Sequence, residues 1–227
     1  MDSDRKTAII VGLLFIIATV TALVTIVFLG DSLDPAAYLI RVAENEINMI
    51  LAVIFWLILA ISVTGIGVMV YPVIKKYHEG IALGYVGFRL IESICIIIAS
   101  ISVLSLLTIS KEYVGGTVEV LYYQPVGALL LALQEWSFEI GTLIFLGFGG
   151  LFLYYPLYKM RLVPWVLSIW GLIGAVCVLL YGVLSLFGLG DSMAVNVLAT
   201  PIAVQEMVFA VWLIVKGFNP IKKKSRG

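Results

Sequence analysis

Ionisable residues inside long apolar stretches constrain this chain more than any other feature of its sequence. Arg89 and Glu92 lie in one such stretch, whereas Glu135 and Glu139 lie in a second. Glu206 lies in a third. A charged side chain near the centre of a bilayer costs about 2.5 to 3.5 kcal/mol on insertion scales, so it normally faces the protein interior and meets a partner. We therefore take these residues as candidates for a functional site.

The composition places the chain in a membrane. Hydrophobic residues make up 62% of the 227 residues, charged residues make up 12%, and the mean hydropathy is +1.13. These values lie outside the range of soluble globular proteins. Six apolar stretches have the roughly 20 residues that a helix needs to cross about 30 Å of hydrocarbon, namely residues 8–29, 49–74, 81–109, 126–155, 165–187 and 194–215. They lack the alternation of barrel strands, so we predict an all-α integral membrane protein, a compact bundle of six transmembrane helices in one domain over residues 1–227.

The charges between these stretches predict an orientation. Basic residues and the only histidine precede the first stretch, follow the second and fourth, and fill the tail at 216–227 (Arg5, Lys6, Lys75, Lys76, His78, Lys159, Arg161, Lys222, Lys223, Lys224 and Arg226). The alternate loops are acidic (Asp31, Asp34, Glu44, Glu46, Glu112, Glu119 and Asp191). Cytoplasmic loops carry the excess of Lys and Arg, so we expect both termini and the basic tail in the cytoplasm and the chain in the cytoplasmic membrane. The net charge of zero gives no indication of nucleic-acid binding.

The N-terminal stretch and the loop after it carry two further predictions. The apolar run at 8–29 is longer than the core of a signal peptide and ends without a small-residue cleavage site, so we predict a retained span. Asp34 followed by Pro35 is typical of an N-cap and a first helical residue. We therefore predict a short helix over residues 35–46 on the outer surface.

The sequence indicates no cofactor, and we expect no enzymatic activity. Cys95 and Cys177 both lie in apolar stretches, which favours two core cysteines over a disulfide or a metal cluster. A lone His78 in a basic turn excludes bis-histidine haem and multi-histidine zinc sites. A glutamate-based intramembrane hydrolase is the alternative, because paired carboxylates activate water, although no oxyanion hole is evident.

The depth of the carboxylates suggests that they meet. At 1.5 Å per residue, Glu92, Glu139 and Glu206 lie about 16, 20 and 18 Å into their spans, near the bilayer midplane. Arg89 and Glu92 share a helix face at i,i+3, whereas Glu135 and Glu139 share one at i,i+4. Gln134 and Gln205 are adjacent polar donors. One arginine cannot neutralise four carboxylates, so we expect some carboxyl groups to be protonated or to bind a cation, unless the polar groups form a static clasp between helices.

Pro201 is expected inside the last span, five residues before Glu206. A proline there either kinks the helix for packing alone or frees a backbone carbonyl close to the carboxylate. The sequence leaves both interpretations open.

Four segments carry a resemblance to a known family. They are RKTAIIVGLLF near the N-terminus, YPVIKKYHEGIALGYVGFRLIES, LYKMRLVPWVLSIWGLIGA, and QEMVFAVWLIVKGFNP near the C-terminus. Together they resemble the bacterial and archaeal membrane family known as domain of unknown function 4386, nearly end to end. The resemblance implies a compact multi-helix membrane protein with Arg89, Glu92, Glu135 and Glu206 in the family's signature stretches and Glu139 beside one. It implies no established activity.

Two functional hypotheses follow. The first is a small proton- or cation-coupled transporter or channel-like protein, in which Glu92, Glu139 and Glu206 bind the ion and Arg89 is the counter-charge. Six spans are few for a secondary transporter, so this hypothesis includes a homo-oligomer. The alternative is a non-catalytic sensor, assembly factor or lipid-binding scaffold, whose polar core fixes helix register within the lipid bilayer.

Overall fold

The computed structural model describes residues 3–116, 122–190 and 197–220, and this part of the chain contains helices and no strands. Six of its helical segments are long and apolar enough to cross a membrane. They are α1 (Ser3–Leu29), α3 (Glu46–Ile74), α4 (Glu79–Val114), the continuous helix α5 (Tyr123–Glu139), η2 (Ile140–Phe145) and α6 (Leu146–Met160), then α7 (Trp165–Leu186), and finally η3 (Val197–Ala199) with α9 (Thr200–Val215). The predicted all-helical, multi-span architecture is therefore confirmed. Residues 194–196 of the last predicted span, Glu119, Asp191 and the tail from residue 221 onward lie outside the described residues.

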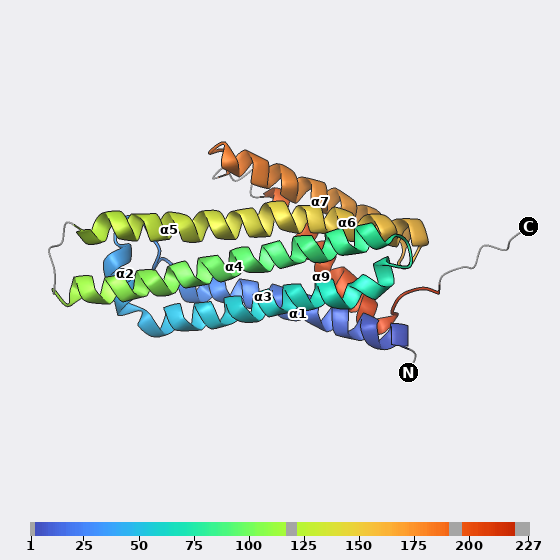
Figure 1. The fold of residues 1–227 in the computed structure, drawn as a ribbon, viewed down its shortest axis with the longest axis horizontal. Helices are drawn as coiled ribbons and strands as arrows, with labels where there is room; N and C mark the ends of the chain where they lie inside the picture. Colours follow the sequence, from blue (N-terminus) through green and yellow to red (C-terminus); the bar gives the residue numbers. More distant parts are fainter. Residues whose placement is uncertain (1–2, 117–121, 191–196, 221–227) are drawn as a thin grey trace, which may run out of the picture.

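Successive spans run in opposite directions, so alternate connections gather at the two ends of the bundle (Figure 1). The start of α1, the end of α9, the α3–α4 turn and the α6–α7 turn share one end. The basic residues that the charge pattern assigns to the cytoplasm therefore gather at this end, as far as the structure describes them. We call it the basic end. Its cytoplasmic location stays a prediction from the charge pattern.

Side chains tie the basic end together. The Arg5 guanidinium donates hydrogen bonds to the carbonyls of Leu213 and Ile214 and thereby satisfies the last turn of α9. Lys76 pairs with Asp4 at 2.9 Å, which links α1 to the α3–α4 turn. In that turn Lys75 pairs with Glu79 at 2.7 Å. The hydrogen bond that Lys75 donates to Glu79 raises the pKa of Lys75, and the contact with Tyr71 raises it further.

The helix between the first two spans is shorter than the sequence predicts. It is α2, Tyr38–Glu44, and Asp34 is not its N-cap. Asp34 instead accepts a hydrogen bond from the Ala36 amide at 3.0 Å and pairs with Arg41 at 3.1 Å. The Ala37 amide donates to the Asp34 carbonyl at 3.0 Å, so residues 34–37 form a turn with Pro35 in its second position. Asp and Pro are common at helix starts and also in turns, and here they form a turn.

Two glycines of α7 allow close packing against α6 and α9. A Cβ on Gly174 of α7 would lie 2.9 Å from Cα of Ile202 in α9, and one on Gly171 would lie 2.5 Å from the ring of Tyr154 in α6. Only glycine allows helices to meet at these distances, which is the usual role of small residues between membrane helices. The rings of Tyr154 and Phe209 then meet edge to face at 5.7 Å, which closes this side of the core.

One irregularity lies near the middle of a span, and another lies at the start of the last span. Residues Ile140–Phe145 form a π-helical segment between α5 and α6. Pro201 occupies the first turn of α9, directly after η3. Because the first amides of a helix have no intrahelical acceptor, proline is tolerated there, so it kinks no helix and frees no carbonyl near Glu206. The predicted mid-span effect of Pro201 is therefore wrong, because the regular part of the last helix starts at Thr200.

Candidate functional site

Arg89 is the centre of the polar interior. Only 2% of this residue is exposed, and its guanidinium donates to three side chains. Nη1 donates to Oε2 of Glu92 one turn along α4 at 3.0 Å, and Nη2 donates to Oε1 of Glu206 in α9 at 3.3 Å. Nε donates to the Tyr85 hydroxyl at 3.1 Å. We call these four residues the Arg89 network; it joins the fourth helix of the chain to the last.

Neighbouring helices leave room for this cation and surround it with aromatic rings. The guanidinium carbon lies 5.7 Å from the ring centre of Phe15 in α1 and 5.5 Å from that of Tyr85. Such contacts stabilise a desolvated cation through the negative face of the ring. Gly67 of α3 lies against the arginine stem, because a Cβ there would be 3.1 Å from Cβ of Arg89. Gly149 of α6 also lies near the guanidinium, because a Cβ there would be 3.8 Å from Nε of Arg89.

A second polar contact fixes α4 against α3 one turn farther on. The Ser93 hydroxyl lies 2.9 Å from the Ala60 carbonyl and 2.9 Å from the Arg89 carbonyl, and the Thr64 hydroxyl donates to it at 2.9 Å. Hydroxyl contacts of this kind join membrane helices that have no hydrophobic driving force between them. They hold the helix face that carries Arg89 and Glu92 toward the interior.

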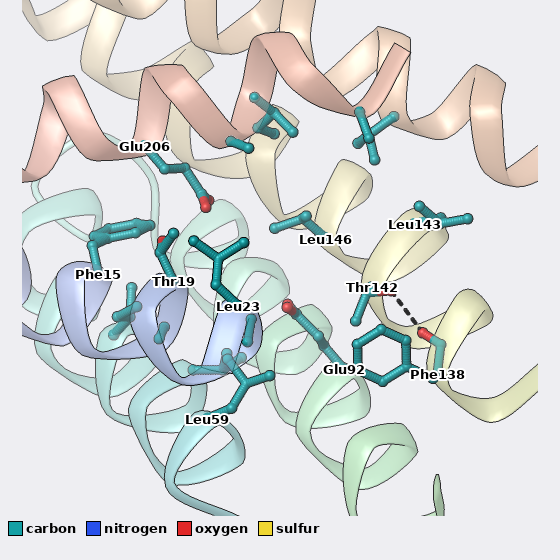
Figure 2. Close-up of a pocket in the computed structure, with 18 of the residues that line it drawn as sticks. Phe15, Thr19, Leu23, Leu59, Glu92, Phe138, Thr142, Leu143, Leu146 and Glu206 are labelled. Carbon is teal, nitrogen blue, oxygen red and sulfur yellow. Dashed lines mark hydrogen bonds between the residues drawn. The ribbon is translucent and has the colours of Figure 1, made fainter. Parts of the chain in front are cut away.

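The Arg89 network borders a cavity of about 290 Å³. Residues from α1, α3, α4, α5, η2, α6, α7, η3 and α9 line it, and most of them are aliphatic or aromatic. Figure 2 shows Glu92 and Glu206 reaching from different helices toward the same space, with Phe15, Thr19 and Phe138 around it. The cavity is thus mostly apolar, is open where the exposed Leu23 and Ile26 line it, and has a charged wall.

The π-helical segment contributes Thr142 and Leu143 to this wall. The Thr142 hydroxyl donates to the Phe138 carbonyl at 2.8 Å, as the dashed line in Figure 2 marks. π-helical turns inside α-helices occur frequently at functional sites. The π-helical segment beside the charged wall is therefore a second, independent indication that this cavity is a functional site.

The charges of the network do not balance when all three groups are ionised. Two carboxylates, Glu92 and Glu206, share the single guanidinium of Arg89. Their side chains are 5% and 14% exposed, and an uncompensated charge in such surroundings is costly. One more positive charge, a proton or a cation, would neutralise the group.

The other predicted site residues lie elsewhere. Glu139 is half-buried and accepts a hydrogen bond from Ser185 of α7 at 2.7 Å. Glu135 is exposed, and Gln134 is buried. Gln205 donates to the Leu167 carbonyl at 3.1 Å and so faces α7. None of these four borders the cavity, so of the predicted set the structure brings together Arg89, Glu92 and Glu206.

Sequence reasoning missed several residues that shape the site. Tyr85 lies four residues before Arg89 on the same face of α4, so its spacing was available as a signal. Phe15, Thr19 and Thr142 carry no comparable signal, because apolar and hydroxyl residues occur throughout these spans. Their part in the site depends on how α1 and η2 pack against α4.

Comparison with known proteins adds the family. A family described as a domain of unknown function, DUF4386, matches residues 10–217. The chain belongs to this family. The match covers nearly the whole chain, Arg89, Glu92 and Glu206 included. No curated protein and no solved structure matches the chain. Membership in DUF4386 thus implies no activity.

Proposed function

We propose that this member of DUF4386 is a small membrane transporter that binds either a proton or an organic monocation at Glu92 and Glu206. Arg89 is the fixed counter-charge that holds the two carboxylates together. The observation that carries the proposal is the sharing of one guanidinium by two carboxylates on the wall of an apolar cavity. Intramembrane carboxylates in such settings commonly belong to ion or substrate pathways.

The walls favour an organic cation over a metal ion. Ca²⁺ takes six to eight oxygen ligands, whereas this cavity offers two carboxylates and the hydroxyls of Thr19 and Thr142 among apolar side chains. In the part of the chain that the structure describes, no three His, Cys, Asp or Glu side chains are grouped as metal ligands. An ammonium group with apolar substituents would place its charge at Glu206 and its body against Phe15 and Phe138.

Competition for the same carboxylates provides the coupling. A proton on Glu92 or Glu206 and a bound cation each neutralise the excess negative charge, so binding of one favours release of the other. The transporter would lie in the cytoplasmic membrane with its basic end inside, and a homo-oligomer would supply the further spans that secondary transporters normally have.

A structural role is the second candidate, and one observation favours it. The Arg89 guanidinium already donates to Glu92, Glu206 and Tyr85, so the network resembles a fixed clasp between α4 and α9. In this case the protein is a sensor, assembly factor or lipid-binding scaffold, and the cavity takes part in no cation exchange.

Binding of a permanently charged probe separates the two candidates. Benzyltrimethylammonium carries one positive charge, cannot lose a proton, and combines a quaternary nitrogen with an aromatic body. Isothermal titration of the purified protein in neutral detergent should give saturable binding that Glu92→Gln and Glu206→Gln each weaken at least tenfold.

The matched control is Glu46→Gln, because Glu46 pairs with Lys111 at the end of the bundle and does not border the cavity. It should bind the probe as the wild type does. Equal affinities of the wild type and Glu206→Gln would contradict the transporter proposal and favour the clasp.

A further inference from the structure

A second pocket, of about 550 Å³, lies at the basic end between the end of α6 and the start of α7. Its lining combines two cations, Lys159 and Arg161, with two aromatic residues, Tyr158 and Trp165. Asn219, beyond the end of α9, closes it. We call it the α6–α7 pocket. None of its residues borders the cavity at Glu206, so it is a separate site.

Its two cations have no anionic partner in the described residues, unlike several of their neighbours. Lys75 pairs with Glu79 and Lys76 with Asp4, whereas Arg5 is bound to the carbonyls at the end of α9. The Lys159 ammonium lies 5.6 Å from the ring centre of Tyr155, and the Arg161 guanidinium has no ion pair among these residues. Both positive charges therefore remain available to an anion.

The backbone at Arg161 is held in a conformation that favours glycine. With φ 53° and ψ 35°, Arg161 is the one non-glycine residue with positive φ among those described. It ends α6 in a Schellman arrangement, because the Leu162 amide donates to the Leu157 carbonyl and the Arg161 amide to that of Tyr158. Glycine usually occupies this position. Residues in such sparsely populated backbone conformations cluster at ligand-binding sites, and this one carries a cation of the pocket.

The segment after α9 holds this turn in place. The Asn219 amide donates to the Leu162 carbonyl at 2.7 Å, and the Asn219 side chain donates to the Arg161 carbonyl at 3.1 Å. The pocket is therefore built by contacts between residues far apart in the sequence. Both Lys159 and Arg161 are exposed residues.

We propose that the α6–α7 pocket binds the phosphate of an anionic phospholipid. Lys159 and Arg161 would contact the phosphate oxygens, and guanidinium groups bind such oxygens in bidentate geometry. Trp165 is 64% exposed and Tyr158 39% at the end of two spans, where amphipathic rings contact lipid at headgroup level. Basic pockets between membrane helices bind anionic headgroups, and the exposed rings favour a lipid over free phosphate. This proposal is independent of the one for the cavity.

Native mass spectrometry of the purified protein, with soluble short-chain lipids, tests it. Dihexanoyl phosphatidylglycerol is the anionic probe, dihexanoyl phosphatidylcholine the zwitterionic one, and inorganic phosphate the lipid-free one. The wild type should bind phosphatidylglycerol in preference to phosphatidylcholine. Arg161→Gly and Lys159→Gln should each weaken binding of phosphatidylglycerol about fivefold, the effect of removing one cation near an anionic lipid. Lys216→Gln is the matched control at the same end, because Lys216 does not line the pocket.

Arg161→Gly also separates binding from folding. Glycine suits the positive φ, so this variant should melt at or above the wild-type temperature while it binds phosphatidylglycerol less well. Unchanged phosphatidylglycerol binding in both Arg161→Gly and Lys159→Gln would overturn the proposal. Equal loss in Lys216→Gln would overturn it too, by showing a diffuse charge effect. If inorganic phosphate displaced the lipid at equal concentration, the pocket would be a site for free phosphate, and the lipid assignment would fail.

Discussion

Glu206 and Glu139 are both mid-span carboxylates, yet the fold places them in different surroundings. Glu206 pairs with Arg89, shares that cation with Glu92, and borders the cavity. Glu139 accepts a hydrogen bond from Ser185 on the neighbouring helix and lies away from the cavity. Depth in the membrane is therefore a weak criterion for function. The bonding partner is the better criterion. A carboxylate that shares its counter-charge still needs a positive charge, whereas a carboxylate bound by a hydroxyl forms a local contact between two helices.

The largest effect is expected from removing the shared cation. Arg89→Met keeps most of the side-chain volume but leaves Glu92 and Glu206 without their counter-charge in the interior. Breaking a buried ion pair in this way costs about 3 to 5 kcal/mol, which should appear as a large drop in the midpoint of denaturant unfolding. A loss below about 1 kcal/mol would show that the network is not a charged group in the folded protein.

Double variants sharpen the comparison further. Arg89→Met combined with Glu206→Gln should be less destabilising than the sum of the single changes, with a coupling of about 0.5 to 3 kcal/mol, because the two residues are in contact. Arg89→Met combined with Glu139→Gln should be additive within about 0.5 kcal/mol, because no contact joins them. Similar coupling free energies of Arg89 with Glu206 and with Glu139 would show that the two carboxylates do not differ in their relation to Arg89.

Glu139→Gln alone should have the smallest effect. A glutamine carbonyl still accepts the hydrogen bond from Ser185. The free energy of unfolding should therefore change by no more than about 1.5 kcal/mol, the contribution of a typical hydrogen bond. Affinity for benzyltrimethylammonium should stay at the wild-type value. A tenfold loss of probe binding in this variant would return Glu139 to the binding site.

Helix periodicity and hydropathy predicted the spans well because each span satisfies its own backbone hydrogen bonds in lipid. The Arg89–Glu92 contact was predictable for a related reason, since i,i+3 neighbours on one helix face each other. The contact between Arg89 and Glu206 was expected only as one of several possible pairings of the mid-span charges, because the two residues lie 117 positions apart in the sequence. Helix periodicity and hydropathy do not predict which helices pack against each other.

The remaining differences arise from packing and turn chemistry. Gln205 precedes Glu206, but the next residue on a helix points about 100° away, so one faces α7 and the other the cavity. Asp34 and Pro35 suit a turn as well as a helix start, and only the observed hydrogen bonds decide between them. The cavity itself has no sequence signal, because it depends on where α1, η2 and α9 meet.

The most direct test of the central claim is proton release on binding of benzyltrimethylammonium, measured with a pH-indicating dye in weakly buffered solution. If Glu92 and Glu206 hold either a proton or the cation, the wild type should release about one proton per bound probe. Glu206→Gln should release none, whereas Glu46→Gln should behave as the wild type. Saturable binding to the wild type without proton release, or release that persists in Glu206→Gln, would contradict the account.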